Sequence, residues 1–147
     1  MKARLAKSDW ILLALSFAEG APMSPVQLQK SIFLFKKRLV GANIPKKFYK
    51  FVPYSYGPFC QEIYADARGL ELEGLISIDE GANHIRQYSA TPAGRSKAID
   101  LAKGISPRGI SHGKEIVSWV KAQSFRELVS AIYQKYPRCM ANSIFKG

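Results

Sequence analysis

The sequence predicts a mainly α-helical single domain with a small β-hairpin, arranged like a winged helix. Apolar residues recur at helical spacing in several segments of the chain. Two short alternating segments, residues 76–80 and 84–90, flank a Gly-Ala-Asn turn and predict the hairpin. A chain of 147 residues is long enough to bury its own core. We expect one domain over residues 1–147, with a winged-helix-like core at about 24–103 and C-terminal helices at about 111–136.

The first predicted helix, residues 8–19, is expected to lie at the centre of the core. Ser8 is a typical N-cap, and Asp9 suits the positive end of the helix dipole. Its apolar residues point to every side, which is typical of a helix that is buried all round.

The second predicted helix, residues 24–39, starts with the helix-initiating pair Ser24-Pro25, and Gly41 is expected to cap its end. Its core stripe consists of Leu28, Ile32, Phe35 and Leu39. The opposite side carries Lys30 and Lys37 together with Val26 and Phe33. This second face either binds a nucleic-acid backbone or packs on another element while the lysines reach water, and we favour packing.

Residues 51–75 are the stretch around which the chain is organised. An aromatic extended run turns at Gly57, and Pro58 is expected to open a helix over residues 58–73. The inner face of this helix contains Phe59, Ile63, Ala67 and Leu70. Its other faces supply the candidate contacts to a protein partner. These are Gln61 and Arg68 on the outer face and an acidic flank of Glu62, Asp66 and Glu73.

After the hairpin, Thr91-Pro92 predicts the start of a helix that runs to about residue 103. Residues 104–113 are expected to form a loop. Its glycines do not match a phosphate-binding P-loop, because their spacing is one residue short and Glu115 follows the lysine. Helices are expected at residues 114–122 and 124–136, the second opened by a capping box of Ser124 and Glu127, and Ile144 and Phe145 are expected to dock back on the domain.

The net charge of +11 is the unusual bulk property of this chain. The charge is +8 over residues 1–50, −3 over residues 51–100 and +6 over residues 101–147. A positive field of this size favours polyanions such as nucleic acid, an anionic membrane surface or an acidic protein. The candidate nucleic-acid contacts are Lys30, Lys36, Lys37, Arg38, Lys46, Lys47 and Lys50.

Residues that carry catalysis or hold metals are scarce in this sequence. His84 and His112 have no second ligand at metal-binding spacing, and Cys60 is expected to be a small buried side chain rather than a reactive thiol. We therefore expect no catalytic residue, no metal and no cofactor. No apolar run is long enough to span a membrane, and two cysteines give no disulfide framework, so we expect a cytoplasmic protein.

Short motifs along most of the chain resemble known families. Tyr54-Ser55-Tyr56-Gly57-Pro58-Phe59 resembles the Tyr-Gly-Pro signature of the Panacea (SocA-like) antitoxin-associated domain and of bacterial proteins of the YwgA type. Leu28-Gln29-Lys30 resembles the element that precedes this signature, and Tyr133-Gln134-Lys135-Tyr136-Pro137 resembles the C-terminal end of the YwgA type. Tyr88 to Gly94 is similar to the end of the wing in many winged-helix regulators, with Ala90 where Leu is usual. The first resemblance implies a mainly helical, non-catalytic domain that neutralises a toxin.

Three classes of function follow from these observations. The first is a non-enzymatic regulatory module of the antitoxin type that binds a protein partner, with the acidic flank of residues 58–73 in its contact surface. The second is a winged-helix DNA-binding transcriptional regulator. The third and least favoured is an enzyme. The acidic flank counts against the second class, because it would lie near phosphates in a DNA groove. The identity of the partner and the oligomeric state are left open by the sequence.

Overall fold

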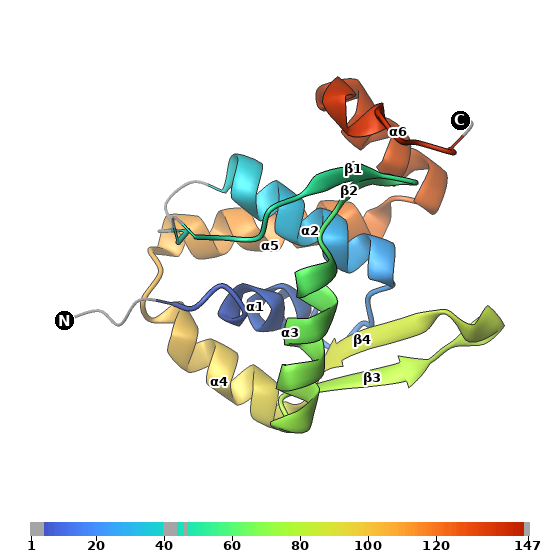
Figure 1. Cartoon of the computed structure of the whole chain (residues 1–147). Helices are drawn as coiled ribbons and strands as arrows, with labels where there is room; N and C mark the ends of the chain where they lie inside the picture. The colour runs from blue at the N-terminus through green and yellow to red at the C-terminus, as the bar shows by residue number, and fades with distance from the viewer. Residues whose placement is uncertain (1–4, 40–43, 46, 146–147) are drawn as a thin grey trace.

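A computed structural model describes residues 5–39, 44–45 and 47–145 of the chain (Figure 1). The prediction of a mainly helical fold is confirmed. The described residues form the helices α1 Asp9–Phe17, α2 Pro25–Arg38, α3 Gln61–Leu72, α4 Pro92–Ala102, α5 Pro107–Ala122 and α6 Phe125–Lys135. They also form the strands β1 Val52–Tyr54, β2 Gly57–Phe59, β3 Ile76–Glu80 and β4 Arg86–Ala90, with short 3-10 turns η1 Ala82–His84 and η2 Pro137–Met140.

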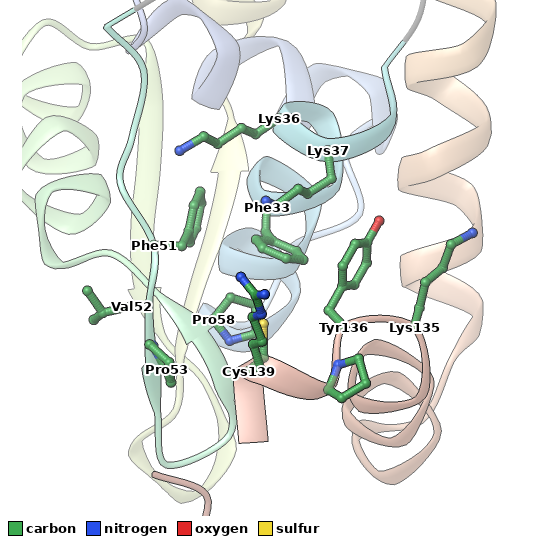
Figure 2. Close-up of a pocket in the computed structure, with 12 residues that line it drawn as sticks. Phe33, Lys36, Lys37, Phe51, Val52, Pro53, Pro58, Lys135, Tyr136 and Cys139 are labelled. Carbon is green, nitrogen blue, oxygen red and sulfur yellow. The ribbon is translucent and has the colours of Figure 1, made fainter. Parts of the chain in front are cut away.

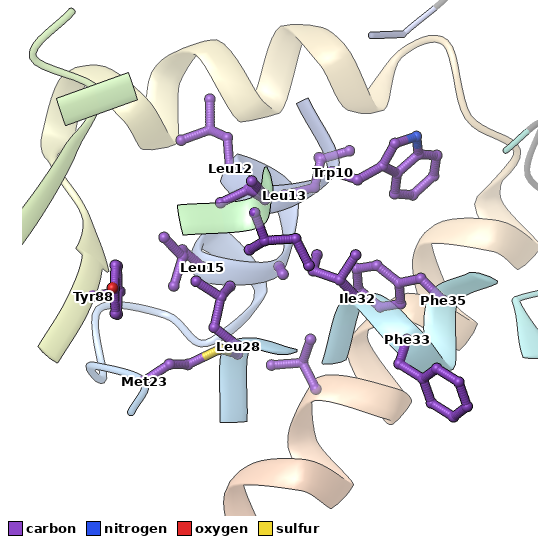
Figure 3. Packing of buried hydrophobic residues seen from close by; sticks show 14 of the residues in the cluster. Trp10, Leu12, Leu13, Leu15, Met23, Leu28, Ile32, Phe33, Phe35 and Tyr88 are labelled. Carbon is purple, nitrogen blue, oxygen red and sulfur yellow. The ribbon is translucent and has the colours of Figure 1, made fainter. Parts of the chain in front are cut away.

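Helix α1 is the centre of the core, as predicted. All six residues from Trp10 to Leu15 are buried, and α2, α3, α4, α5 and β4 contact the helix from different sides. Figure 3 shows its side chains packed against Ile32 and Phe35 of α2. Burying each of these large apolar side chains contributes about 1.5–3 kcal/mol. The N-terminus differs from the prediction, because Ser8 makes no capping hydrogen bond and the Asp9 carboxylate instead accepts one from the Ala6 N–H.

Helix α2 begins as its sequence predicts. Ser24 accepts a hydrogen bond from the Gln27 N–H, the Gln27 side chain bonds back to Ser24, and Pro25 occupies the first turn. The stripe residues Leu28, Ile32 and Phe35 are fully buried. The predicted glycine cap at Gly41 lies outside the described residues.

The stretch that contains Gly57 and Pro58 is a β-hairpin, which corrects the prediction of a helix start at Pro58. Strands β1 and β2 pair antiparallel, with Val52 opposite Phe59 and Tyr54 opposite Gly57. Gly57 has a φ of 107°, a conformation that favours glycine. Helix α3 begins only at Gln61, and its inner face of Ile63, Ala67 and Leu70 is buried as expected.

The second hairpin forms where the sequence predicts it. Strands β3 and β4 pair antiparallel from Ile76–Ala90 to Glu80–Arg86. Met23, in the loop before α2, adds an antiparallel bridge to Tyr88 through two backbone hydrogen bonds of 2.8 and 2.9 Å. The Thr91 hydroxyl caps α4 by accepting from the Gly94 N–H, and it donates to the Gly74 carbonyl. Helix α4 is therefore fixed to the exit of α3.

The loop predicted for residues 104–113 is mostly helix, because α5 begins at Pro107. Ser106 caps it by accepting a hydrogen bond from the Gly109 N–H. One of the glycines that suggested a loop serves packing instead: a Cβ on Gly113 would lie 2.8 Å from the Phe17 ring. Within the described residues, no helix is both long and apolar enough to cross a bilayer.

The C-terminal segment docks on the first hairpin. Helix α6 starts with the predicted capping box of Ser124 and Glu127. The Ile144 N–H donates to the Ser55 carbonyl at 3.0 Å, and the Asn142 side chain donates to the Pro53 carbonyl at 3.1 Å. These contacts place η2 and the first hairpin side by side (Figure 1).

Candidate binding pocket

A pocket of about 500 Å³ lies between α2, the first hairpin and η2; we call it the hairpin pocket. Figure 2 shows its side chains converging from these three parts of the chain. Its apolar lining consists of Phe33, Phe51, Val52, Pro53, Pro58, Tyr136, Pro137 and Cys139. Its cationic lining consists of Lys36, Lys37, Lys135 and Arg138.

Aromatic rings form the apolar floor of the hairpin pocket. Phe33, which is only 3% exposed, packs edge to face against Phe51 at 5.3 Å and against Tyr136 at 5.0 Å between ring centroids. Such pairs contribute about 0.5–1.5 kcal/mol beyond their burial and hold the rings in fixed orientations. The predicted packing role of Phe33 is therefore confirmed, and its partners come from segments that are distant in the sequence.

Four cations surround this apolar floor. The Lys36 ammonium donates to the Tyr49 carbonyl at 2.8 Å and lies 5.9 Å from the Phe51 ring centroid. The Lys37 ammonium lies 5.8 Å from the Phe33 ring centroid. Lys135 and Arg138 line the pocket from the C-terminal segment, and no Asp or Glu is among the described residues that line it. Like charges beside an apolar concavity focus the field, so the pocket attracts anions.

A buried cation lies next to the lining residues. Lys30 is 3% exposed, and its ammonium donates to the Pro58 carbonyl at 3.1 Å. Burial lowers the pKa of Lys30 to about 8, and the nearby Cys139 thiol, when ionised, acts in the opposite direction. Burial also raises the pKa of Cys139, against the influence of Lys30 and Lys37. Among the described carboxylates, none forms an ion pair with Lys30.

The neighbouring residue Gln29 holds the hairpin in place. Its buried side chain donates to the Cys60 carbonyl and accepts from the Cys60 N–H, both at 2.9 Å. With Lys30 bonded to Pro58, two adjacent residues of α2 bind the backbone at the end of β2. This contact joins the Leu28-Gln29-Lys30 motif to the end of the Tyr54–Phe59 motif, and both motifs belong to the first resemblance. The contact of Gln29 with the hairpin was not predicted from the sequence, although Gln29 is part of the Leu-Gln-Lys motif singled out there.

The structure brings together only some of the predicted basic contacts. Lys36 and Lys37 line the hairpin pocket, whereas Arg38, Lys47 and Lys50 are exposed but do not line it. Lys46 lies outside the described residues. The prediction that Lys30 is a nucleic-acid contact is wrong, because its ammonium is buried against a backbone carbonyl and is not on an exposed face. Lys135 and Arg138 were not predicted, and their signal was the basic charge that flanks Tyr136-Pro137.

The predicted acidic contacts lie along α3, and several are engaged within the chain. Glu62 pairs with Lys7, Asp66 accepts a 2.6 Å hydrogen bond from the Tyr49 hydroxyl, and Arg68 pairs with Glu71. Burial and the bond to Asp66 raise the pKa of Tyr49. The other two predicted contacts of this helix region, Gln61 and Glu73, are exposed.

In the described part of the chain, no group of three His, Cys, Asp or Glu side chains could hold a metal ion. Cys60 is buried at the start of α3, as expected of a small packing residue, and His84 is exposed beside Glu80. The hairpin pocket combines apolar surface with positive charge, a combination suited to an anionic group that also carries apolar atoms.

No protein-family model, curated protein or solved structure matches the chain.

Proposed function

We propose that the chain is a non-enzymatic regulatory module that binds a protein partner through the hairpin pocket. One observation carries this proposal: an aromatic, apolar pocket is surrounded by four cations and has no carboxylate among its described lining residues. Its volume of about 500 Å³ suits a few side chains of a partner. The resemblance to antitoxin-associated domains supports a toxin as the partner.

The charges on α3 and the second hairpin disfavour a simple DNA-binding mode. Helix α3 carries Glu62, Asp66 and Glu71 against a single arginine that is already paired with Glu71. The second hairpin adds Asp79 and Glu80 on β3. Phosphates of a duplex that approached α3 and this hairpin would meet like charge, which weakens binding.

A winged-helix DNA-binding regulator is the second candidate, and one observation favours it. Apart from the β1–β2 hairpin between α2 and α3, the order of α1, the Met23 bridge, α2, α3 and the β3–β4 hairpin is the order of elements in a winged helix. Its test is a gel shift with duplex DNA at increasing salt, using the wild type and a variant with Lys37→Gln and Lys47→Gln. DNA binding predicts a steep loss of affinity with salt that becomes shallower in the variant. Absence of binding to any duplex at low salt rejects this candidate.

The main proposal is tested by co-expression with the protein encoded next to this chain in its genome. We expect a stable complex that Lys37→Glu with Arg138→Glu disrupts, because both changes reverse charge at the pocket. The matched control is Lys97→Glu with Arg108→Glu, which makes the same change in net charge at exposed positions on α4 and α5. A complex that tolerates both double variants equally contradicts a role for the pocket.

The acidic flank is a separate candidate surface in the same experiment. Glu62→Lys with Glu73→Lys tests it without touching Asp66, whose bond to Tyr49 supports the fold. Loss of the complex in this variant alone would assign the contact to α3 instead of the hairpin pocket.

A further inference from the structure

We infer, building on the proposed function, that the hairpin pocket takes an acidic partner segment that carries an apolar or aromatic anchor side chain. The anchor enters the aromatic floor, and flanking carboxylates meet the surrounding cations. This assignment concerns the chemistry of the partner, whatever its identity.

The floor is shaped for insertion of a side chain more than for stacking of a base. Nucleic-acid platforms offer exposed ring faces on which bases stack. Here Phe33 is 3% exposed, and it is flanked edge to face by Phe51 and Tyr136. A side chain that fills the remaining space buries apolar area at about 25 cal/mol per Å² without needing a free ring face.

The charges of the pocket favour an anionic partner. Lys36 and Lys37 approach the pocket from α2, and Arg138 approaches from η2. Lys30 adds a buried positive charge beside Pro58 and Cys139, and no described carboxylate pairs with it. Carboxylates near these groups are attracted in a partly desolvated setting, where charges interact more strongly than in bulk water.

The surface next to the pocket continues the apolar character. Val52 and Tyr54 of β1 are 54% and 53% exposed, and Met140 of η2 is 51% exposed. Strand β1 and η2 are in contact, so these side chains extend the binding surface beyond the pocket. A segment with alternating acidic and apolar residues complements both parts of this surface, whereas a uniformly charged polyanion complements only the cations.

The test uses a short fluorescein-labelled peptide with one Trp flanked on both sides by Asp and Glu. We expect saturable binding by fluorescence anisotropy, and a loss of affinity of about tenfold or more in Lys37→Glu with Arg138→Glu. The control variant Lys97→Glu with Arg108→Glu should bind like the wild type. Replacing Trp by Ser in the peptide should weaken binding, and replacing its acidic residues by Lys should abolish it.

Cys139 provides a second measurement that needs no substitution. Because it lines the pocket, the bound peptide should slow its alkylation by iodoacetamide, and a bulky maleimide on Cys139 should block peptide binding. Cys60, which is 7% exposed, is the internal reference. Equal binding by both charge variants, or unchanged alkylation of Cys139, overturns the inference.

A labelled single-stranded oligonucleotide tests whether the pocket binds nucleic acid instead of an acidic protein segment. Tighter binding of oligothymidylate than of the peptide, with protection of Cys139, would assign the pocket to nucleic acid and overturn the inference. If the genomic neighbour binds through the pocket but the acidic peptide does not, the proposed function stands and the partner chemistry is wrong. If the peptide binds but no genomic neighbour does, the partner chemistry stands and the proposed function is wrong.

Discussion

At the scale of single residues, Gln29 determines the shape of the first hairpin. A buried amide that satisfies both the N–H and the C=O of Cys60 fixes the backbone there in an extended conformation. Helix α3 therefore starts at Gln61, although Pro58 could have opened it earlier. The neighbouring Lys30 ammonium donates to the carbonyl of Pro58, which lines the hairpin pocket.

Replacing Gln29 by Ala should destabilise the fold by about 1–3 kcal/mol, because it leaves the Cys60 N–H buried without a partner, whereas the Cys60 carbonyl keeps its hydrogen bond from the Ile63 N–H. Urea unfolding followed by circular dichroism measures this change. The control is Gln61→Ala at an exposed position of α3, which should change the free energy of unfolding by less than about 0.5 kcal/mol. Equal losses in the two variants would mean that the Gln29 bonds contribute little.

Lys30 should make stability depend on pH in an unusual direction. Its pKa falls from 10.5 to about 8 on folding, so the unfolded chain binds more protons between these values. Stability contributed by neutral Lys30 is therefore fully present above pH 10.5 and is lost as the pH falls through 8. Relative to Lys30→Met, the wild type should gain about 2 kcal/mol of unfolding free energy between pH 8 and pH 10.

Urea unfolding at several pH values measures this difference. Both chains should carry Cys139→Ser, because the nearby Cys139 thiol would otherwise titrate in the same range. A constant difference between the two chains across this range would contradict a buried, pH-sensitive Lys30.

At the scale of secondary-structure elements, three helix caps and the second hairpin could be predicted because their signals are local. Ser24-Pro25, Thr91-Pro92 and the Ser124 capping box each act within one turn of the chain. The first hairpin could not be predicted in this way, because it depends on Gln29 of a different helix. The start of α5 was not predicted for another reason. Its glycines are typical of loops, whereas Gly113 lies within the helix because the Phe17 ring packs where a Cβ would be.

Two helical glycines give a matched test of packing between elements. A Cβ on Gly94 would lie 1.9 Å from the Leu75 carbonyl oxygen, whereas a Cβ on Gly69 would meet nothing within 4 Å. Gly94→Ala should therefore cost about 3 kcal/mol or more, because α4 must move away from the exit of α3. Gly69→Ala should stabilise the protein by about 0.5–1 kcal/mol through helix propensity.

Thermal and urea unfolding of the two alanine variants compare them directly. A Gly94→Ala protein as stable as the wild type would show that close packing against Leu75 does not fix the position of α4.

At the scale of the whole molecule, charge separates into two regions. The hairpin pocket gathers cations from α2 and the C-terminal segment, while α3, the Glu73 that follows it and strand β3 together carry six of the eleven Asp and Glu residues. The sequence predicted this separation as segment charges, and it supplied Lys36 and Lys37 as candidates. It could not predict the pocket, because Phe33, Phe51 and Tyr136 meet only through tertiary packing.

The central claim is that this pocket, and not α3 with the second hairpin, is the surface that binds an acidic partner. Titration of the isotope-labelled protein with the acidic Trp peptide, followed by amide chemical shifts, tests it most directly. We predict that the largest shifts cluster at Phe33, Lys37, Phe51 and Cys139, and that Arg68 and Asp79 barely move. Shifts centred on α3 and the β3–β4 hairpin, with an unperturbed pocket, would contradict the claim.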